Sequence, residues 1–237
     1  MNSLCHYCQH NLCIHRVPIF SALNQEALLS IVPLIQRHRY SKGELILCEG
    51  DAVDSLMIIN HGSVKAYRIT PDGREQILYV FSEGDFFGEA NLFGQQKANY
   101  SVEALEEVFT CSLTKEKFEI LIREYTEIAL RIIEELGRRI SVMETSLQSM
   151  GVRSINARIA ALLLEYQDKF SVVTPEGTEL HLPLSREGMA NSLGIARETL
   201  SRKLGQLETK RIIRTLNNKT MLVLQPESLQ KLAGYSE

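Results

Sequence analysis

Three cysteines lie within nine residues near the start of the chain, in the pattern Cys5-x2-Cys8-x4-Cys13. Thiolate sulfur is a ligand for iron–sulfur clusters and for zinc, so thiols at this density indicate metal or redox chemistry. A fourth ligand would complete a tetrahedral set. The same segment carries three of the six histidines, whose imidazole rings are also zinc ligands: His6, His10 and His15.

The remaining sequence indicates the compartment in which these thiols operate. Residues 1–16 contain no continuous apolar segment of a secretory signal, and no apolar run approaches the roughly 18 residues that span a bilayer. We therefore expect a cytoplasmic protein without membrane contact. Thiols stay reduced there, which disfavours a structural framework of disulfides for the five cysteines.

The composition, 44% hydrophobic and 23% charged, is that of a globular protein with one large or two modest domains. The net charge of −3 gives no general attraction to nucleic acid, so DNA binding has to come from the Lys and Arg residues clustered between Arg186 and Lys219. An enzyme is disfavoured, because the chain has no Gly-x-Ser-x-Gly elbow, no Gly-x4-Gly-Lys loop and no cysteine with a recognisable His/Asn partner motif.

Three successive patterns predict the elements that position these groups. Short apolar alternations between glycine-bearing turns, from Val17 to Leu113, predict a β-sandwich or β-roll. From Lys115 to about Ser149 apolar residues recur every three or four positions, which predicts one long helix. Its stripe would pack on the β-domain or pair with a second copy as in a coiled coil, and we favour the homodimer. The stripe includes Ile132, Leu136, Ile140, Met143 and Leu147.

The C-terminal third predicts a helix, a tight turn at Gly194 and a second helix, followed by a β-hairpin around Asn217-Asn218. This order is typical of a winged helix-turn-helix that reads DNA. On the second helix four polar residues share one face, and arginine, glutamate and serine can all contact base edges. They are Arg197, Glu198, Ser201 and Arg202, and at the start of the first helix Ser185 and Arg186 are placed to contact phosphates.

With these motifs the chain resembles the cyclic-AMP receptor/fumarate-nitrate regulator (CRP/FNR) superfamily of bacterial transcription factors. The resemblance spans nearly the whole chain and rests on Lys42-Gly43-Glu44, Glu49-Gly50-Asp51, Gly84-Asp85-Phe86-Phe87-Gly88-Glu89 and Arg197-Glu198-Thr199-Leu200-Ser201-Arg202. It implies an α+β fold: a cysteine-rich segment (residues 1–16), a β-roll sensor of the cyclic-nucleotide-binding type (17–114), a dimerisation helix (115–150) and a winged helix (151–237). It also implies a homodimer on palindromic double-stranded DNA and contact with RNA polymerase.

The same resemblance constrains the DNA sequence that is read. Glu198, Ser201 and Arg202 match the Glu-x-x-Ser-Arg motif of the FNR branch, which recognises a TTGAT-like half-site. Arg197 is typical of the cyclic-AMP receptor branch, which prefers TGTGA-like half-sites. We expect a TGA core, with the preceding base open.

Cyclic AMP is disfavoured as the signal. Nucleotide binders of this superfamily follow Gly-Glu, some ten residues on, with an Arg-Ser/Thr pair that neutralises the cyclic phosphate. Here Gly88-Glu89 is followed by Ala98-Asn99, with only Lys97 nearby. A buried phosphate without its arginine would lack the charge-assisted contacts that normally hold it.

The resemblance favours the cysteines as the sensor instead. Cys111 matches the distant ligand of the oxygen-sensing FNR proteins, in which four cysteines hold a [4Fe–4S] cluster; oxygen converts it, the dimer weakens and DNA is released. That pattern has five residues, not four, between the second and third cysteines, so a zinc site or a disulfide between an N-terminal cysteine and Cys111 stays open. Cys48, beside the apolar Leu47, is expected to pack in the core.

A second departure concerns the dimer. In the FNR proteins an acidic residue on the seam between the helices opposes dimerisation until the cluster assembles. The matching position here is Met143, and the adjacent Glu144 is expected to point off the stripe. This predicts a tighter dimer.

Overall fold

The computed structural model describes residues 17–234, apart from positions 22, 93, 95–96, 153 and 176. Residues 1–16, and with them the three clustered cysteines, lie outside the described residues. The chain divides into two compact units, residues 1–68 with 79–141 and residues 69–78 with 142–237. Each unit is described by itself below.

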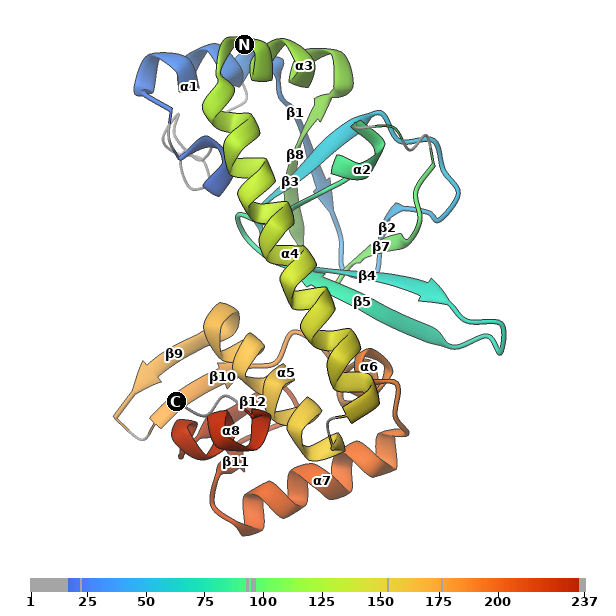
Figure 1. The fold of residues 1–237 in the computed structure, drawn as a ribbon, viewed down its shortest axis with the longest axis vertical. Coiled ribbons are helices and arrows are strands. Elements are labelled where there is room, and N and C mark those ends of the chain that lie inside the picture. The colour runs from blue at the N-terminus through green and yellow to red at the C-terminus, as the bar shows by residue number, and fades with distance from the viewer. Residues whose placement is uncertain are drawn as a thin grey trace. The chain divides into compact units, whose positions relative to one another are not determined.

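The first unit contains two four-stranded sheets that form a β-roll, as Figure 1 shows, and this confirms the predicted fold class. Sheet A has the strand order β1-β8-β3-β6 and sheet B the order β2-β7-β4-β5. The strands of sheet A are β1 (Gln36–Tyr40), β8 (Val108–Thr114), β3 (Ser55–His61) and β6 (Phe86–Phe87). Those of sheet B are β2 (Leu45–Leu47), β7 (Ser101–Ala104), β4 (Val64–Ile69) and β5 (Glu75–Phe81).

Alternation along the strands of sheet A builds two separate apolar cores. Ile59, Phe87 and Val108 face an inner cluster that they share with Val64, Val102 and other side chains of sheet B. The opposite face of sheet A carries an outer cluster, contributed by Leu56, Ile58, Phe86 and Leu113. The turns between strands use glycine where the backbone requires it. Gly62, for example, has φ +85°, and a Cβ there would lie 2.5 Å from the carbonyl oxygen of Glu107.

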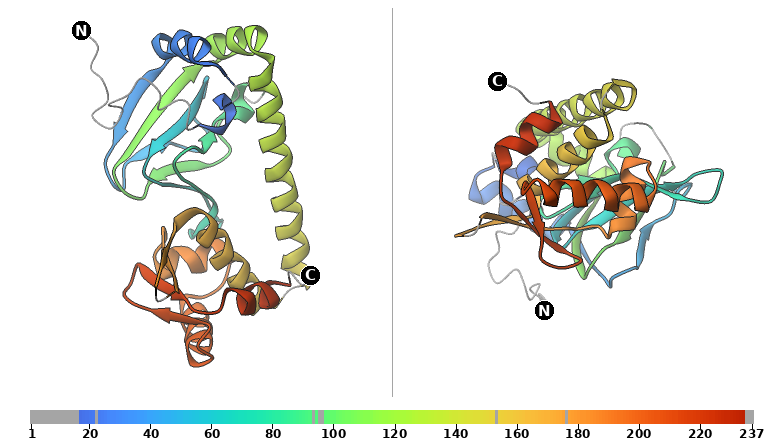
Figure 2. Two further views of the ribbon diagram at one scale, coloured as in Figure 1. Left: turned by 90° about the vertical axis from the view of Figure 1, so that its left-hand side faces the viewer. Right: turned by 90° about the horizontal axis from the view of Figure 1, so that it is seen from below.

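Helices cover the outer cluster of sheet A. Two 3-10 turns, η2 (Pro18–Phe20) and η3 (Val32–Leu34), flank α1 (Gln25–Ile31), which lies beside α3 across one end of the roll in Figures 1 and 2. A short helix α2 (Glu89–Leu92) follows β6. The single long helix predicted from Lys115 onward is wrong in one respect, because it is two helices: α3 (Lys115–Glu124) and α4 (Thr126–Val152).

The break falls at Tyr125, whose φ of −124° and ψ of 86° are not helical. It allows both helices to bury apolar side chains in the outer cluster, through Phe118 and Leu121 of α3 and through Ile128 and Ile132 of α4. The first turns of α4 are therefore part of the core of the roll.

One cross-strand row of sheet A matters for the site described below. In this row Cys111 of β8 pairs with Arg37 of β1 on one side and with Ile58 of β3 on the other, and Ile58 pairs in turn with Phe86 of β6. Directly paired residues project their side chains from the same face of a sheet. Cys111 therefore shares the face that carries the outer cluster.

The second unit contains the predicted winged helix-turn-helix. Its four-stranded sheet has the order β11-β12-β10-β9, and neighbouring strands pair antiparallel. Helix α5 (Ile155–Phe170) comes first and is followed by a hairpin of β9 (Ser171–Thr174) and β10 (Gly177–His181). The two helices of the DNA-binding motif are α6 (Arg186–Leu193) and α7 (Arg197–Thr209), and the wing strands are β11 (Ile213–Thr215) and β12 (Thr220–Val223). The last element, α8 (Pro226–Ala233), was not predicted from the sequence pattern. None of the helices that the structure describes has the length and apolarity needed to cross a membrane.

Candidate DNA-binding and sensor sites

The two helices of the DNA-binding motif are fixed by caps and by a shared apolar core. Ser185 caps α6, accepting a hydrogen bond from the backbone N–H of Gly188 at 3.1 Å. Gly194 ends the helix in a left-handed conformation with φ 61° and so supplies the predicted turn. The buried contact surface comprises Met189, Ala190 and Leu193 of α6 and Leu200, Leu204 and Leu207 of α7.

The opposite side of α7 carries the four residues predicted to read bases, and all four are exposed: Arg197, Glu198, Ser201 and Arg202. We call this set the reading face. Within the described part of the chain, none of the four side chains makes a hydrogen bond or an ion pair. These residues therefore do not form a salt-bridged helix face, which is the commoner arrangement of Arg/Glu pairs. Their hydrogen-bonding groups face solvent, as readout of base edges requires. α7 is seen obliquely from below in the right-hand view of Figure 2.

The two residues predicted to contact phosphate have different environments. Ser185 is exposed, although its hydroxyl oxygen already serves as the cap of α6. Arg186 is half-buried, and its Nη2 donates to Oγ1 of Thr215 on the wing at 3.2 Å. Burial lowers the pKa of Arg186, and the nearby Glu208 opposes that shift. Arg186 therefore joins α6 to the wing, a role that its position in the sequence did not reveal.

Cys111 is the only residue of the predicted cysteine set that the structure describes, because Cys5, Cys8 and Cys13 lie outside the described residues. Its side chain is 3% exposed. The side-chain amide nitrogen of Asn60, on the neighbouring strand β3, lies 2.7 Å from Cys111 Sγ and donates to it. The thiol is thus buried and has a polar partner.

The prediction that Cys48 packs in the core is wrong, because its side chain is exposed. Strand β2 ends at Leu47, and Cys48 begins the following turn, where its backbone N–H donates to Asp51 Oδ2 at 3.1 Å. The apolar neighbour in the sequence was a poor guide, since the strand had already ended.

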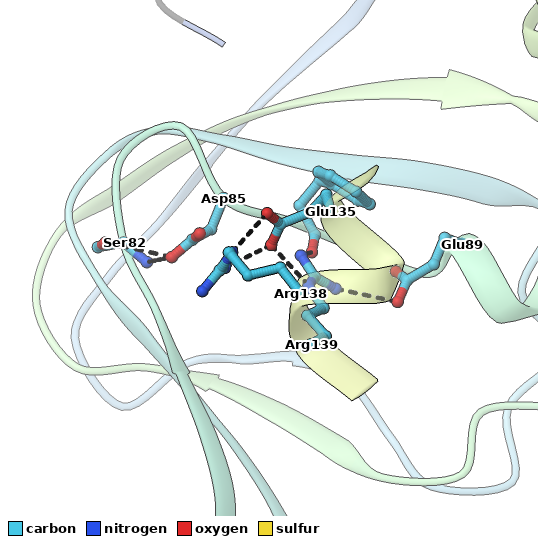
Figure 3. Close-up of polar contacts among 7 residues, drawn as sticks. Ser82, Asp85, Glu89, Glu135, Arg138 and Arg139 are labelled. Atoms are coloured by element: carbon cyan, nitrogen blue, oxygen red, sulfur yellow. Dashed lines mark hydrogen bonds and ion pairs between the residues drawn. The ribbon is translucent and has the colours of Figure 1, made fainter. Parts of the chain in front are cut away.

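A buried polar cluster, drawn in Figure 3, joins the roll to α4. The guanidinium of Arg139 donates to Glu89 Oε1 and Glu135 Oε1, each at 3.0 Å, and to the carbonyl oxygen of Phe86 at 2.8 Å. Its Cζ also lies 4.4 Å from the ring centroid of Phe86 and 5.3 Å from that of Phe81. The Arg139 side chain is only 13% exposed. Arg139 is therefore engaged on every side, by two carboxylates, one carbonyl and two aromatic faces.

Burial and charge shift the acids of this cluster in opposite directions. Burial raises the pKa of Glu89, and the charge of Arg139 partly offsets it. For Glu135, burial alone would raise the pKa, but hydrogen bonds from Arg138 and Arg139 outweigh burial and leave it below its usual value. The neighbouring Tyr100 has a raised pKa, chiefly because it is buried. No sequence motif linked Glu89 with Arg139, because the two are far apart in the chain.

Helix α4 has two apolar faces, and the predicted dimer stripe mixes residues of both. Ile132 is 2% exposed and lies in the outer cluster, and Leu136 packs against the same cluster. Ile132 is therefore covered by the roll, and Leu136 is partly covered by it. The exposed apolar residues form a different row, consisting of Leu130 (57% exposed), Ile133 (64%) and Ile140 (57%), with Gly137 between them. We call this row the free face of α4.

The row of the free face continues at the same alternating spacing to Glu144, whose side chain is exposed. Glu144 therefore lies on the free face. The side chains of Met143 and Leu147 lie outside the described residues.

Comparison with known proteins agrees with both units. Residues 37–125 match the cyclic nucleotide-binding domain family, and residues 157–232 match the Crp-like helix-turn-helix domain family. The nitrogen fixation regulation protein FixK of Bradyrhizobium diazoefficiens is 30% identical over 97% of this chain and 94% of its own length. The fumarate and nitrate reduction regulatory protein of Vibrio cholerae is 28% identical over 98% of this chain and 92% of its own length.

Comparison with solved structures leads to similar proteins. The structure of FixK2 from Bradyrhizobium japonicum superposes with a TM-score of 0.75, at 23% sequence identity, and the match covers 84% of this chain and 96% of that one. A cyclic-nucleotide-type β-roll, a long helix and a winged helix with an exposed reading face thus occur in the same order as in relatives that regulate transcription. The chain is a DNA-binding transcription regulator of the CRP/FNR family.

Proposed function

We propose that this regulator responds to oxygen or redox state through a [4Fe–4S] cluster held by Cys5, Cys8, Cys13 and Cys111. It binds palindromic DNA as a homodimer, reads TTGA- or TGTGA-like half-sites and contacts RNA polymerase. The observation that carries the sensor part of this proposal is the environment of Cys111, which is buried, accepts a hydrogen bond and faces the cluster of side chains from which the N-terminal segment departs.

The departure point can be located from the core. Val17 lies in the outer cluster together with Leu113. Leu113 is two positions after Cys111 on β8, so these two side chains share one face of the sheet. Cys13 is four residues from Val17, a distance that an extended chain spans in about 14 Å. Cys8 and Cys5 have longer tethers from the same point. The cluster would require these three cysteines to meet Cys111, and four cysteine thiols are the donor set that such a cluster takes.

The cluster would supply a centre that oxygen alters. The chain's own contribution would be one cysteine on the central strand β8 and three in the segment before Val17. Zinc remains a candidate because His6, His10 and His15 lie among the same cysteines. A disulfide switch remains a candidate because the N-terminal segment supplies three thiols that could pair with Cys111.

The interior of the roll supports a signal other than a cyclic nucleotide. Glu89, the acid of the Gly-Glu motif, is already paired with Arg139 of the chain itself. The residues that stand where nucleotide binders carry Arg-Ser/Thr are Ala98, which is buried, and Asn99, which is exposed. No arginine is supplied at that position for a cyclic phosphate.

The free face of α4 supports the homodimer. Its apolar side chains alternate at three and four residues, which is the spacing of a coiled-coil seam. Gly137 would tolerate a Cβ, with no atom within 4 Å, and glycine in a helix costs roughly 1 kcal/mol relative to alanine. A second helix that approaches closely at Gly137 accounts for this cost. Glu144 lies in the same row, while Met143 stands where the FNR proteins carry their acidic residue, and the tighter dimer stays a prediction.

The test is a UV–visible spectrum with iron, sulfide and zinc analysis on protein purified and reconstituted without oxygen. Broad absorption near 400 nm with about four iron and four sulfide per monomer, bleached by air, is the expected result. Cys111→Ser should abolish the cluster and spare the fold, while Cys48→Ser, at an exposed turn, is the matched control and should retain it.

Other results would overturn the cluster. Stoichiometric zinc in a colourless protein would make the N-terminal segment a zinc site. Without any metal, a disulfide between Cys111 and an N-terminal cysteine would be the remaining account, and mass spectrometry after oxidation would identify it. Unchanged iron in Cys111→Ser would refute the assignment of the fourth ligand.

A further inference from the structure

Thr215 is the point at which three elements of the DNA-binding unit meet. It ends β11, the edge strand of the sheet, and precedes the turn of the wing. Its backbone N–H donates to Oε1 of Glu208, near the C-terminal end of α7, at 2.7 Å. Its Oγ1 accepts from Nη2 of Arg186, the first residue of α6, at 3.2 Å. These three residues, which we call the wing anchor, tie the edge of the wing to both helices of the DNA-binding motif.

Glu208 contributes more than one hydrogen bond to the wing anchor. An edge strand leaves backbone N–H groups without a partner in the sheet, and Glu208 accepts from one of them. Its charge also attracts Arg186, which is half-buried and whose Nη1 is buried without a hydrogen-bond partner among the described residues. A partly buried cation is unfavourable without such a counter-charge. Loss of this carboxylate would therefore release Thr215 and leave Arg186 beside the wing without its opposite charge.

The turn that follows the wing anchor, residues 216–219, is the wing tip, and all four of its residues are exposed. The backbone N–H of Asn217 donates to the carbonyl oxygen of Thr220 at 3.2 Å. The backbone N–H of Lys219 donates in turn to Oδ1 of Asn217 at 2.8 Å. The wing tip is thus held together by its own hydrogen bonds, so its position follows that of Thr215.

Lys219 gives the wing tip a positive charge. Its side chain is exposed and makes no hydrogen bond or ion pair within the part of the chain that the structure describes. An exposed ammonium can bind a phosphate oxygen of DNA, a contact that fixes the position of a protein on the duplex without reading its sequence. The reading face lies on the same helix as Glu208, so the wing anchor sets the separation between the reading face and this cation.

We propose that Glu208 is a positioning residue for DNA binding, which holds the wing so that Lys219 meets a phosphate while the reading face of α7 meets the bases. Glu208 acts through Thr215 and does not itself contact DNA, because a carboxylate would be repelled by the phosphates. The inference rests on DNA binding by the winged helix, and it does not depend on the cysteines of the proposed sensor or on the sequence of the half-site.

The sign of the effect separates positioning from charge. Loss of a carboxylate should by charge alone strengthen binding to a polyanion. Glu208→Ala is expected instead to weaken binding about tenfold, measured by fluorescence anisotropy on a duplex that the parent chain selects from random sequence and on an unrelated duplex. Glu208→Gln keeps an acceptor for the Thr215 N–H and should restore most of the affinity. Glu227→Ala, which removes an exposed acid of α8, is the matched control and should bind at least as tightly as the parent.

A double variant tests whether Glu208 acts through the wing. Lys219→Ala should weaken binding to both duplexes by a similar factor and reduce the slope of log K against log salt by about one, as the loss of one phosphate contact does. Lys231→Ala, at an exposed position of α8, is the control and should leave the slope unchanged. In the Glu208→Ala protein, whose wing is no longer held, Lys219→Ala should have little further effect on either quantity.

Three results would overturn the proposal: Glu208→Ala binding as tightly as the parent, Lys219→Ala leaving the salt slope unchanged, or Lys219→Ala costing the same factor in the parent and in Glu208→Ala. If circular dichroism shows that Glu208→Ala does not fold, the same cycle is measured with Thr215→Val, which removes the hydroxyl that accepts from Arg186 and should weaken binding about threefold. A selected duplex without a TGA core would refute the proposed half-site and leave this test intact.

Discussion

Two regions of the chain use the same residue type in opposite ways. In the roll, Arg139 is buried and each end of its guanidinium meets a carboxylate, a carbonyl or an aromatic ring. On α7, Arg197 and Arg202 are exposed and make no hydrogen bond or ion pair within the described residues. The fold uses the interactions of the first arginine for its own stability. It leaves those of the other two available for DNA.

The largest expected effect follows from breaking the buried pair. Arg139→Gln leaves Glu89 buried without its cation, which should destabilise the roll by about 3–5 kcal/mol in chemical denaturation. The adjacent Arg138 is 55% exposed and pairs with the same Glu135, so Arg138→Gln is the matched control and should cost less than about 1 kcal/mol. Equal losses in the two variants would show that the burial of Arg139 does not matter.

The pH dependence of the Arg139→Gln effect has a definite sign. Burial already places the pKa of Glu89 above its ordinary value of 4.5, and removal of Arg139 takes away the charge that opposes this shift. A raised pKa in the folded state means that stability is present below pH 4.5 and is lost as the pH rises through the folded-state pKa. The destabilisation by Arg139→Gln should therefore shrink as the solution is acidified toward pH 4.5.

Helix α4 likewise has a buried side and an exposed side, and substitutions there are expected to give the next largest effects. Ile132→Ala removes a side chain from the outer cluster and should destabilise the monomer by about 2–4 kcal/mol. Ile133→Ala, at a position that is 64% exposed, should leave monomer stability within about 0.5 kcal/mol and weaken the dimer. Denaturation at low concentration and sedimentation equilibrium separate the two quantities. A dimer weakened by neither substitution would place the seam elsewhere.

On the reading face, a substitution should change binding without changing the fold. Arg202→Ala is expected to cost about 1–3 kcal/mol of DNA affinity and to relax the preference at one guanine of the half-site. Fluorescence anisotropy on a palindrome and on variants of that guanine, at one salt concentration, measures both effects. Because Arg202 has no partner within the described chain, the thermal unfolding midpoint of the Arg202→Ala variant should equal that of the parent protein.

The smallest expected effect has opposite signs in the monomer and the dimer. Gly137→Ala should stabilise α4 by up to about 1 kcal/mol, since alanine is the better helix former and a Cβ has room there. The same methyl group should weaken the dimer by separating the paired helices. Denaturation of Gly137→Ala in a protein that also carries Ile133→Glu, which should keep it monomeric, measures the change in the unfolding free energy of the monomer. Sedimentation of Gly137→Ala alone measures the change in the dimer dissociation constant. A dimer of unchanged strength would mean that no helix approaches at Gly137.

The sequence was sufficient for features determined by local patterns. Alternating strands, the change of period at Lys115, the Gly194 turn and the exposed residues of α7 all follow from spacing and turn chemistry, and the structure confirms them. The break at Tyr125 and the terminal helix α8 were missed. Tyr125 has no proline or glycine beside it that would have marked the break. Helix α8 was missed although Pro226 begins it and Gly234 follows it.

Features determined by distant contacts could not be predicted. Periodicity placed Ile132, Leu136 and Ile140 on one stripe, but the roll covers the first two and leaves the third exposed. The burial of Arg139 depends on Glu89 and Phe86, and the role of Arg186 depends on Thr215. Each of these pairs is far apart in sequence, so no local rule could join them.

The cross-strand row of sheet A has a consequence for how a signal could travel. Along the chain, Cys111 and Arg139 are separated by all of α3 and half of α4. Across the sheet, Cys111 pairs with Ile58, Ile58 pairs with Phe86, and the carbonyl oxygen of Phe86 accepts from Arg139. Close-packed interiors transmit displacement rather than absorb it. A shift of β8 at Cys111 would therefore reach α4, which carries the free face, through three neighbouring contacts.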